Sequence, residues 1–234
     1  MDYSAIAFIS VSIFAIVHLI AGKSSHLERL THGRFLSAGG GVAIAYVFVD
    51  LLPKLCKSDI VVREALEGIF PYFERHVFVM ALAGFLLFFL VDRSPTFLRE
   101  KDRFWLSLSS YAFFNFLVGY AVVDIDNPEV KPLALFTFAM ALHYFVNDYS
   151  LNKEHGEEYR TWGKWVLIIS LFLGWFTGLW IILSPTAVAL VSAFIGGGVI
   201  MNVTRHELPK ENPNSSGAFL IAAIIYTIIL LTIG

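Results

Sequence analysis

His143, Asn147 and Asp148 are polar residues within an otherwise apolar stretch, AMALHYFVNDYS at 139–150. His143 and Asn147 are four residues apart, so they share one face if the stretch is helical. An ionised side chain at the centre of a membrane helix costs about 2.5–3.5 kcal/mol, and polar residues there usually face a bundle interior, a water-filled path or an ion. We therefore expect this stretch to line a cation site inside a helix bundle.

The composition of the chain sets its class. Hydrophobic residues make up 57% of the 234 residues, charged residues only 15%, and the mean hydropathy is +0.69. A soluble domain of this length cannot bury so large an apolar share in one core. We predict an all-α, polytopic membrane protein with one transmembrane domain over residues 1–234. The net charge of −2 gives no reason to expect a nucleic-acid partner, and the single cysteine, Cys56, excludes an intramolecular disulfide.

Apolar segments long enough to cross about 30 Å of hydrocarbon occur along the whole chain. The N-terminus lacks the basic region of a cleavable signal, so we interpret the first segment as a retained span. Lys and Arg are most frequent in the loops after the first, third, fifth and seventh spans, which places both termini outside the cytoplasm and suggests a plasma membrane or bacterial inner membrane. The eight expected spans are 4–22, 36–54, 76–92, 104–123, 132–151, 164–184, 186–205 and 217–233.

Two of these spans share a sequence motif. The second contains GGGVAIAYVFVDLLPK (39–54) and the seventh contains GGGVIMNVTRHELPK (196–210), with one residue fewer between the glycines and the Leu-Pro-Lys ending. The two spans run in opposite directions across the membrane, as in inverted-repeat transporters. We expect repeats over about 4–92 and 164–233, with central helices over about 104–151. The alternative is that the glycines only allow close helix approach.

Eight spans in a 3+2+3 arrangement, outside termini and the paired glycine motifs resemble the ZIP family of divalent-metal transporters. In that family the fourth span carries H-N-x-x-D-G and the fifth carries H-E-x-x-H-E, which together hold metal at a binuclear site. The matching segments here are FNFLVG at 114–119 and HYFVND at 143–148. The resemblance covers nearly the whole chain in architecture, and it implies a metal site on these two helices.

The agreement at the metal motifs is partial. Asn115, Gly119 and His143 match the family pattern, and Asp148 replaces Glu conservatively. Four ligand positions differ, and they are occupied by Phe114, Val118, Tyr144 and Asn147. The histidine-rich loop that the family has between its third and fourth spans is also absent, since residues 92–104 contain no histidine.

These departures change the metal that the site would prefer. Zinc favours His, Cys and carboxylate ligands, whereas this face offers one imidazole, two amides and one carboxylate. We therefore expect a single weak metal site made by His143, Asn115, Asn147 and Asp148, whose oxygen-rich ligands shift its preference toward Mn²⁺ or Fe²⁺. The divalent metal is the substrate, and no prosthetic group is expected.

Further polar residues suggest a cation pathway. Asp50 would attract the cation at the outer end of the second span, Asn202 would add a carbonyl ligand, and His206 with Glu207 would pass the cation inward. Each has a simpler interpretation, as an interfacial carboxylate, an amide bonded between helices, or a solvated turn. By the same reasoning, we interpret His18 near the inner end of the first span as a packed or interfacial histidine.

We thus expect a ZIP-like transporter that moves Zn²⁺, Mn²⁺ or Fe²⁺ toward the cytoplasm. One alternative is a non-transporting protein of the same fold with a decayed metal site, acting as a sensor or scaffold, since apolar or bulky side chains occupy three ligand positions. Another is a permease for a different solute. A membrane metalloenzyme is less favoured, because histidines do not converge at one depth. The expected partners are the lipid bilayer and a divalent cation, and the glycine-rich faces are compatible with a homodimer.

Overall fold

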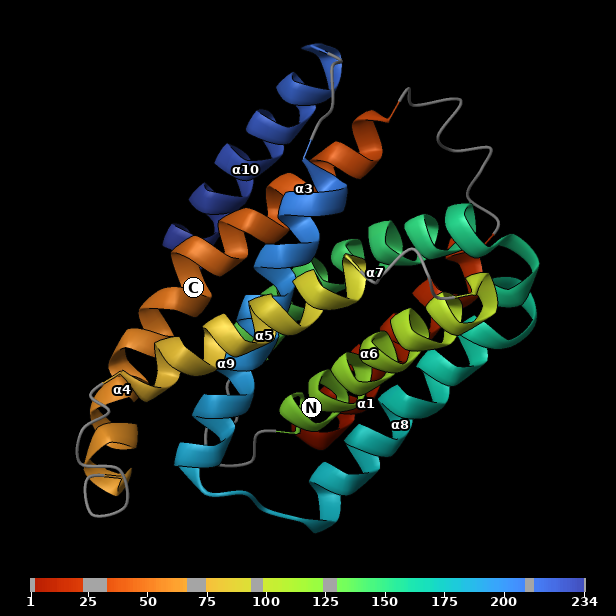
Figure 1. The fold of residues 1–234 in the computed structure, drawn as a ribbon. Helices are drawn as coiled ribbons and strands as arrows, with labels where there is room; N and C mark the ends of the chain where they lie inside the picture. The colour runs from red at the N-terminus through yellow and green to blue at the C-terminus, as the bar shows by residue number, and fades with distance from the viewer. Residues whose placement is uncertain are drawn as a thin grey trace.

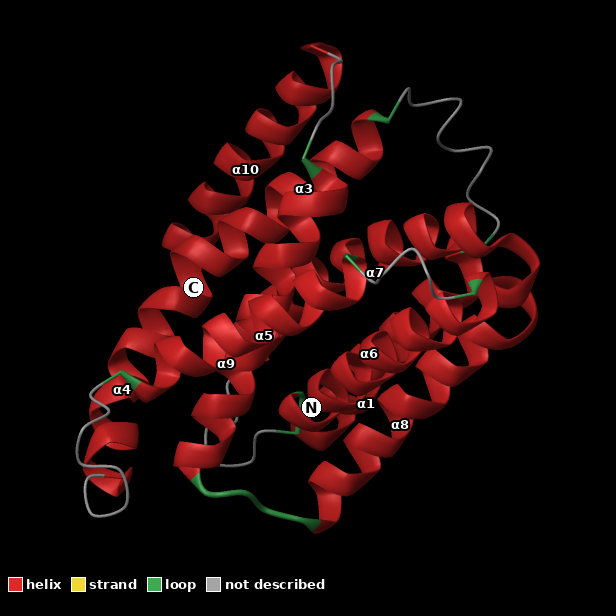
Figure 2. Ribbon diagram, in the orientation of Figure 1, coloured by secondary structure: helices red, strands yellow, loops and turns green. Residues whose placement is uncertain are grey.

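The computed structural model describes residues 3–22, 33–66, 75–93, 99–123, 130–208 and 213–233, and these residues form helices joined by short turns with no strand among them (Figures 1 and 2). The prediction of an all-α protein is therefore confirmed. The helices are α1 (Tyr3–Ala21), α3 (Arg34–Tyr46), η1 (Val47–Leu51), α4 (Leu52–Leu66), α5 (His76–Asp92), α6 (Glu100–Ala121), α7 (Val130–Glu158), η2 (Tyr159–Gly163), α8 (Lys164–Trp180), α9 (Pro185–Asn202), η3 (Val203–Glu207) and α10 (Pro213–Ile233).

Five helical stretches within the described residues are long and apolar enough to cross a membrane, and α5 is a shorter apolar helix. The outer surface supports the same conclusion, because α10 exposes large aliphatic side chains such as Leu220, Ile224 and Leu231. Water would penalise such a surface, whereas lipid does not. Over its described residues the chain is helical, and the length and apolar character of these helices indicate an integral membrane protein. The five stretches are Tyr3–Ala21, Arg34–Leu66, Val130–Trp180, Pro185–Arg205 and Ser215–Ile233.

Two helix boundaries differ from the sequence prediction. The second span was expected to end at Lys54, but the helix continues through Pro53 as α4 to Leu66. The region after residue 151 was expected to be a loop, but it is helical through η2, with one interruption at Gly156, where φ is +42°. Glycine tolerates this conformation, so the chain turns at a single residue and keeps its helical hydrogen bonds on both sides.

The two glycine-triplet helices end in the same way. The N–H of Leu52 donates to the carbonyl of Val47 at the end of η1, and the N–H of Leu208 donates to Val203 over 3.0 Å at the end of η3. Each bond spans five residues, as in a π-helix, and each leucine precedes a proline in the sequence. Proline has no N–H and crowds the carbonyl four residues earlier, and a π turn widens the helix at that point.

The glycine triplets bring helices into backbone contact. A Cβ added at Gly41 of α3 would lie 2.3 Å from the carbonyl oxygen of Phe219 on α10, and one at Gly197 of α9 would lie 1.8 Å from that of Ala81 on α5. α3 therefore packs on α10, and α9 packs on α5 (Figure 1). In the same way α6 packs closely on α8, and α1 packs on α7. α1, α6 and α7 together surround the polar residues described next.

Candidate functional site

The four predicted ligand residues lie in the interior of the bundle. Asn115 comes from the middle of α6, and His143, Asn147 and Asp148 come from α7; all four side chains are buried. α6 and α7 therefore bring these residues into the interior of the bundle. Asp148 lies one residue beyond the face shared by His143 and Asn147, and it is directed toward α1.

Asp148 is paired with His18, which lies in the last turn of α1. The Nδ1 of His18 is 2.5 Å from Oδ2 of Asp148, and its Nε2 is 2.9 Å from Oδ1 of Asn115. Both side chains of the His18–Asp148 pair are fully buried. We call the linked side chains of His18, Asp148 and Asn115 the central junction, because they join α1, α7 and α6.

The hydrogen bonds of the central junction define its protons. The amide of Asn115 donates from Nδ2 to the carbonyl of Tyr111 over 2.8 Å, so its Oδ1 must accept from Nε2 of His18. The other ring nitrogen of His18 then shares one proton with the carboxyl group of Asp148. Whichever atom carries this proton, the pair has no net charge. Neutrality lowers the cost of burying two ionisable groups inside the membrane.

Tyrosines surround the central junction. The ring of Tyr144 lies 5.0 Å from that of His18 between centroids, and the hydroxyl of Tyr159 donates to the backbone carbonyl of His18 over 3.4 Å. The hydroxyl of Tyr111 donates to Oδ1 of Asn202 on α9 over 3.2 Å. The junction is thus linked to η2 and, through Tyr111, to the second glycine-triplet helix.

Several buried polar atoms beside the junction have no hydrogen-bond partner within the described parts of the chain. They are Oδ1 of Asp148, both amide atoms of Asn147, the hydroxyl of Tyr144 and Nδ2 of Asn202. A buried polar group without a partner costs about 1–3 kcal/mol, and such groups are rare in native proteins. Apolar residues at these positions would not incur this free-energy penalty, so the polar side chains here destabilise the fold.

Aromatic side chains separate the junction from the side of the protein where α1, α7 and α9 begin. Phe14 contacts Phe136 and Tyr144 edge to face, with centroids 6.3 and 5.2 Å apart. Phe114 contacts Tyr144 and lies 6.1 Å from the ring of His143. Phe114 and Tyr144, two of the residues that replace ligands of the ZIP motif, are completely buried. In this conformation they fill the space beside His143.

The predicted pathway residues have individual environments. Asp50 accepts from Lys54 over 2.8 Å, and its side chain is 16% exposed. Asn202 is buried and bonded to Tyr111 as described. His206 and Glu207 belong to η3, but their side chains lie outside the described residues. Asp50 is thus already paired with a cation from its own helix.

The sequence analysis did not identify His18 as part of the site. From the sequence, His18 was interpreted as a packed or interfacial histidine near the inner end of the first span. The available signal was its position as an ionisable residue in an otherwise apolar span, a placement that usually indicates function. Its partners lie 97 and 130 residues away in the chain, so only the fold reveals them.

The region offers few side chains of the kinds that bind metal ions. Within the residues that the structure describes, no group of three or more His, Cys, Asp and Glu side chains is placed to hold a metal. The available atoms are oxygens of Asp148 and Asn147 beside the imidazole of His143. Such a set does not fit a tetrahedral zinc centre.

Comparison with known proteins gives no family assignment. No protein-family model matches the chain, and no curated protein matches it.

Proposed function

We propose that this chain is a membrane transporter of ZIP-like architecture, which moves a divalent metal cation toward the cytoplasm through a weak site beside the central junction. The observation that carries the proposal is the set of buried oxygens without partners at Asp148 and Asn147. Ionisable and polar residues inside membranes usually mark ion pathways. A cation that visits this place would supply the missing partner for both oxygens.

The helix packing supports an inverted repeat with eight spans in a 3+2+3 arrangement. α3 packs on α10 as α9 packs on α5, and α1 packs on α7 as α8 packs on α6. The proposed repeat relates α1, α3 and α5 to α8, α9 and α10, and relates α6 to α7. Under this exchange the α3–α10 pair becomes the α9–α5 pair, and the α1–α7 pair becomes the α8–α6 pair. The matching π turns after the two glycine triplets support the same relation. In inverted-repeat transporters, one repeat moves against the other around a site at their interface.

In this proposal the ion binds between α6 and α7. Asp148 Oδ1, Asn147 and Asn115 would supply oxygen ligands and His143 a nitrogen ligand, which favours Mn²⁺ or Fe²⁺ over Zn²⁺. His18 bonds to Oδ2 of Asp148, and in this proposal the ion would meet Oδ1, in competition with the nearby hydroxyl of Tyr159. Weak binding suits transport, because a permeating ion must also leave. Both termini would lie outside the cytoplasm of a plasma membrane or bacterial inner membrane.

A second candidate is a non-transporting protein of the same fold. The observation that favours it is the complete burial of Phe114 and Tyr144 beside His143. If these rings never move, no ion can reach the amides of α7. The protein would then act as a scaffold or sensor.

Uptake by proteoliposomes tests the transporter proposal. We expect saturable uptake of Mn²⁺, Fe²⁺ or Zn²⁺ by the wild-type protein, and loss of uptake in His143→Ala and Asp148→Asn. Asp102→Asn is a matched control, since Asp102 is an exposed carboxylate on α6 paired with Arg99. No uptake above empty vesicles by a folded wild-type protein, for all three ions, would favour the non-transporting candidate.

A further inference from the structure

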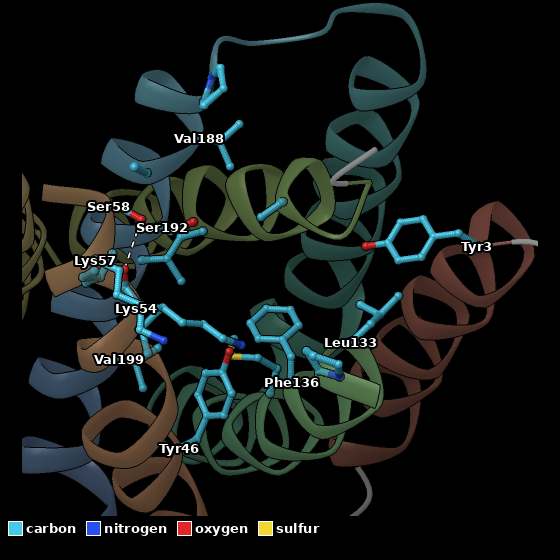
Figure 3. A pocket seen from close by; sticks show the side chains of 18 residues that line it. Tyr3, Tyr46, Lys54, Lys57, Ser58, Leu133, Phe136, Val188, Ser192 and Val199 are labelled. Carbon is cyan, nitrogen blue, oxygen red and sulfur yellow. Dashed lines mark hydrogen bonds between the residues drawn. The ribbon is translucent and has the colours of Figure 1, made fainter. Parts of the chain in front are cut away.

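A pocket of about 560 Å³ lies on the other side of the aromatic residues from the central junction. Most of its wall comes from the start of α4, the first half of α7 and one face along most of α9. Figure 3 shows Lys54, Lys57 and Ser58 on one side, Tyr3 on the opposite side, and Tyr46 with Phe136 in between. Its volume is typical of small-molecule sites and far larger than a single metal ion needs.

The charged side chains in the pocket wall are both lysines. Lys54 is neutralised by Asp50, which also interacts with Tyr46 of the wall, so the excess charge of the wall comes from Lys57. Lys57 is exposed on the next turn of α4 and makes no ion pair with any residue that the structure describes. The pocket therefore carries a net positive charge, which repels a divalent cation and attracts an anion. The hydroxyls of Ser58 and Ser192 add hydrogen-bonding groups to the same wall.

The rest of the wall is apolar. Leu133, Phe136 and Met140 line it from one face of α7, and Val188 and Val199 line it from α9. The ring of Phe136 packs against that of Tyr46, with centroids 5.7 Å apart. These side chains offer contact to a hydrocarbon chain but no partner for a strongly hydrated ion. The pocket is thus polar on its α4 side and apolar on the sides formed by α7 and α9.

From this combination we propose that the pocket binds an amphipathic organic anion. A carboxylate or phosphate group would pair with Lys57, and with Lys54 in competition with Asp50, while a short apolar chain would lie against α7 and α9. Charge-assisted hydrogen bonds fix the head group, and apolar burial adds affinity. The anion comes either from an anionic lipid of the bilayer or from a free solute. This site does not depend on the proposed metal transport.

Binding to the purified full chain in phosphatidylcholine nanodiscs tests the proposal. Radiolabelled octanoate and octyl phosphate are the anionic probes, octylammonium is the cationic probe of matched chain length, and empty nanodiscs give the background. We expect saturable binding of both anions but not of octylammonium. Lys57→Gln should weaken anion binding by about tenfold or more, the effect of losing one charge-assisted hydrogen bond, and Lys57→Arg should restore it.

Matched controls separate a specific effect from a general one. Lys131→Gln removes an exposed lysine at the start of α7 that is not part of the pocket wall, and it should bind octanoate as the wild type does. Ala189→Phe should block binding by filling the pocket. The proposal is overturned if the folded wild-type protein binds neither anion saturably, if Lys57→Gln binds as tightly as the wild type, or if octylammonium binds equally well.

A second arm identifies the source of the anion. Octanoate binding is repeated in nanodiscs that contain phosphatidylglycerol. Weaker apparent binding there would show that an anionic lipid competes for the pocket, and unchanged binding would assign it to a free solute; both results support an anion site. Metal uptake in Lys57→Gln should equal that of the wild type, so a failure of this proposal is distinguishable from a failure of the transporter proposal.

Discussion

The central junction and the pocket are two polar regions with opposite relations to their surroundings. His18 and Asp148 are completely buried and satisfy each other with a shared proton, whereas Lys57 is exposed in the pocket wall without a described ion-pair partner. Phe14, Phe136 and Tyr144 lie between the two regions. An ionisable side chain buried inside a membrane protein is neutralised by its neighbours, whereas an ionisable side chain in an open pocket can remain charged and bind a ligand.

The largest expected effect is the removal of one partner from the central junction. Asp148→Leu leaves His18 buried without its carboxylate, and breaking a buried pair in this way costs about 3–5 kcal/mol. The free energy of unfolding in detergent, measured by denaturant titration, should fall by that amount. The double variant His18→Leu with Asp148→Leu should recover most of the loss, because His18 no longer leaves a buried ring nitrogen without its partner. Equal losses in the single and double variants would contradict the pairing.

A smaller effect is expected at the helix that forms one wall of the pocket. Gly197→Ala places a Cβ against the backbone carbonyl of Ala81, and such overpacking costs about 1–3 kcal/mol. Gly41→Ala, against the carbonyl of Phe219, should cost a similar amount if the two halves are equivalent. Gly217→Ala is the control, since a Cβ there meets nothing within 4 Å. The same unfolding titration measures all three variants, and an unchanged Gly197→Ala protein would contradict the close contact of α9 with α5.

The smallest effect is expected for the ion pair at the pocket wall. Lys54 and Asp50 are four residues apart, with side chains 49% and 16% exposed, and exposed pairs of this kind contribute about 0.2–1 kcal/mol. Lys54→Gln should therefore lower the free energy of unfolding by less than about 1 kcal/mol. A loss as large as that of Asp148→Leu would remove the contrast between the two regions.

The sequence predicted the helical membrane fold, because apolar composition and segment length depend little on tertiary detail. It also located the residues of α7 that face the interior, since helical periodicity places His143 and Asn147 together. The pairing of His18 with Asp148 was not predictable, because it depends on how α1 packs on α7. The π turn that joins α3 to α4 was not predicted either, since such a turn leaves no clear pattern in the sequence.

The pocket was missed for a related reason. From the sequence, Lys54 and Lys57 were assigned no role in binding a ligand. The pocket forms where these lysines of α4 lie beside the apolar faces of α7 and α9. These three segments lie far apart in the sequence. A single helix shows neither the size of a cavity nor the sign of its charge.

Binding of Mn²⁺ to the purified chain, followed by the electron paramagnetic resonance signal of the free ion, tests the central claim most directly. We expect the wild-type protein to bind Mn²⁺ saturably. Binding should be lost in Asp148→Asn, weakened in Asn147→Ala and unchanged in the control Asp102→Asn. Asn147→Ala is informative because Asn147 takes no part in the His18–Asp148 pair, so the junction stays intact. Mn²⁺ binding that is absent in the folded wild type, or that survives both substitutions, would contradict the proposal of a cation site beside the central junction.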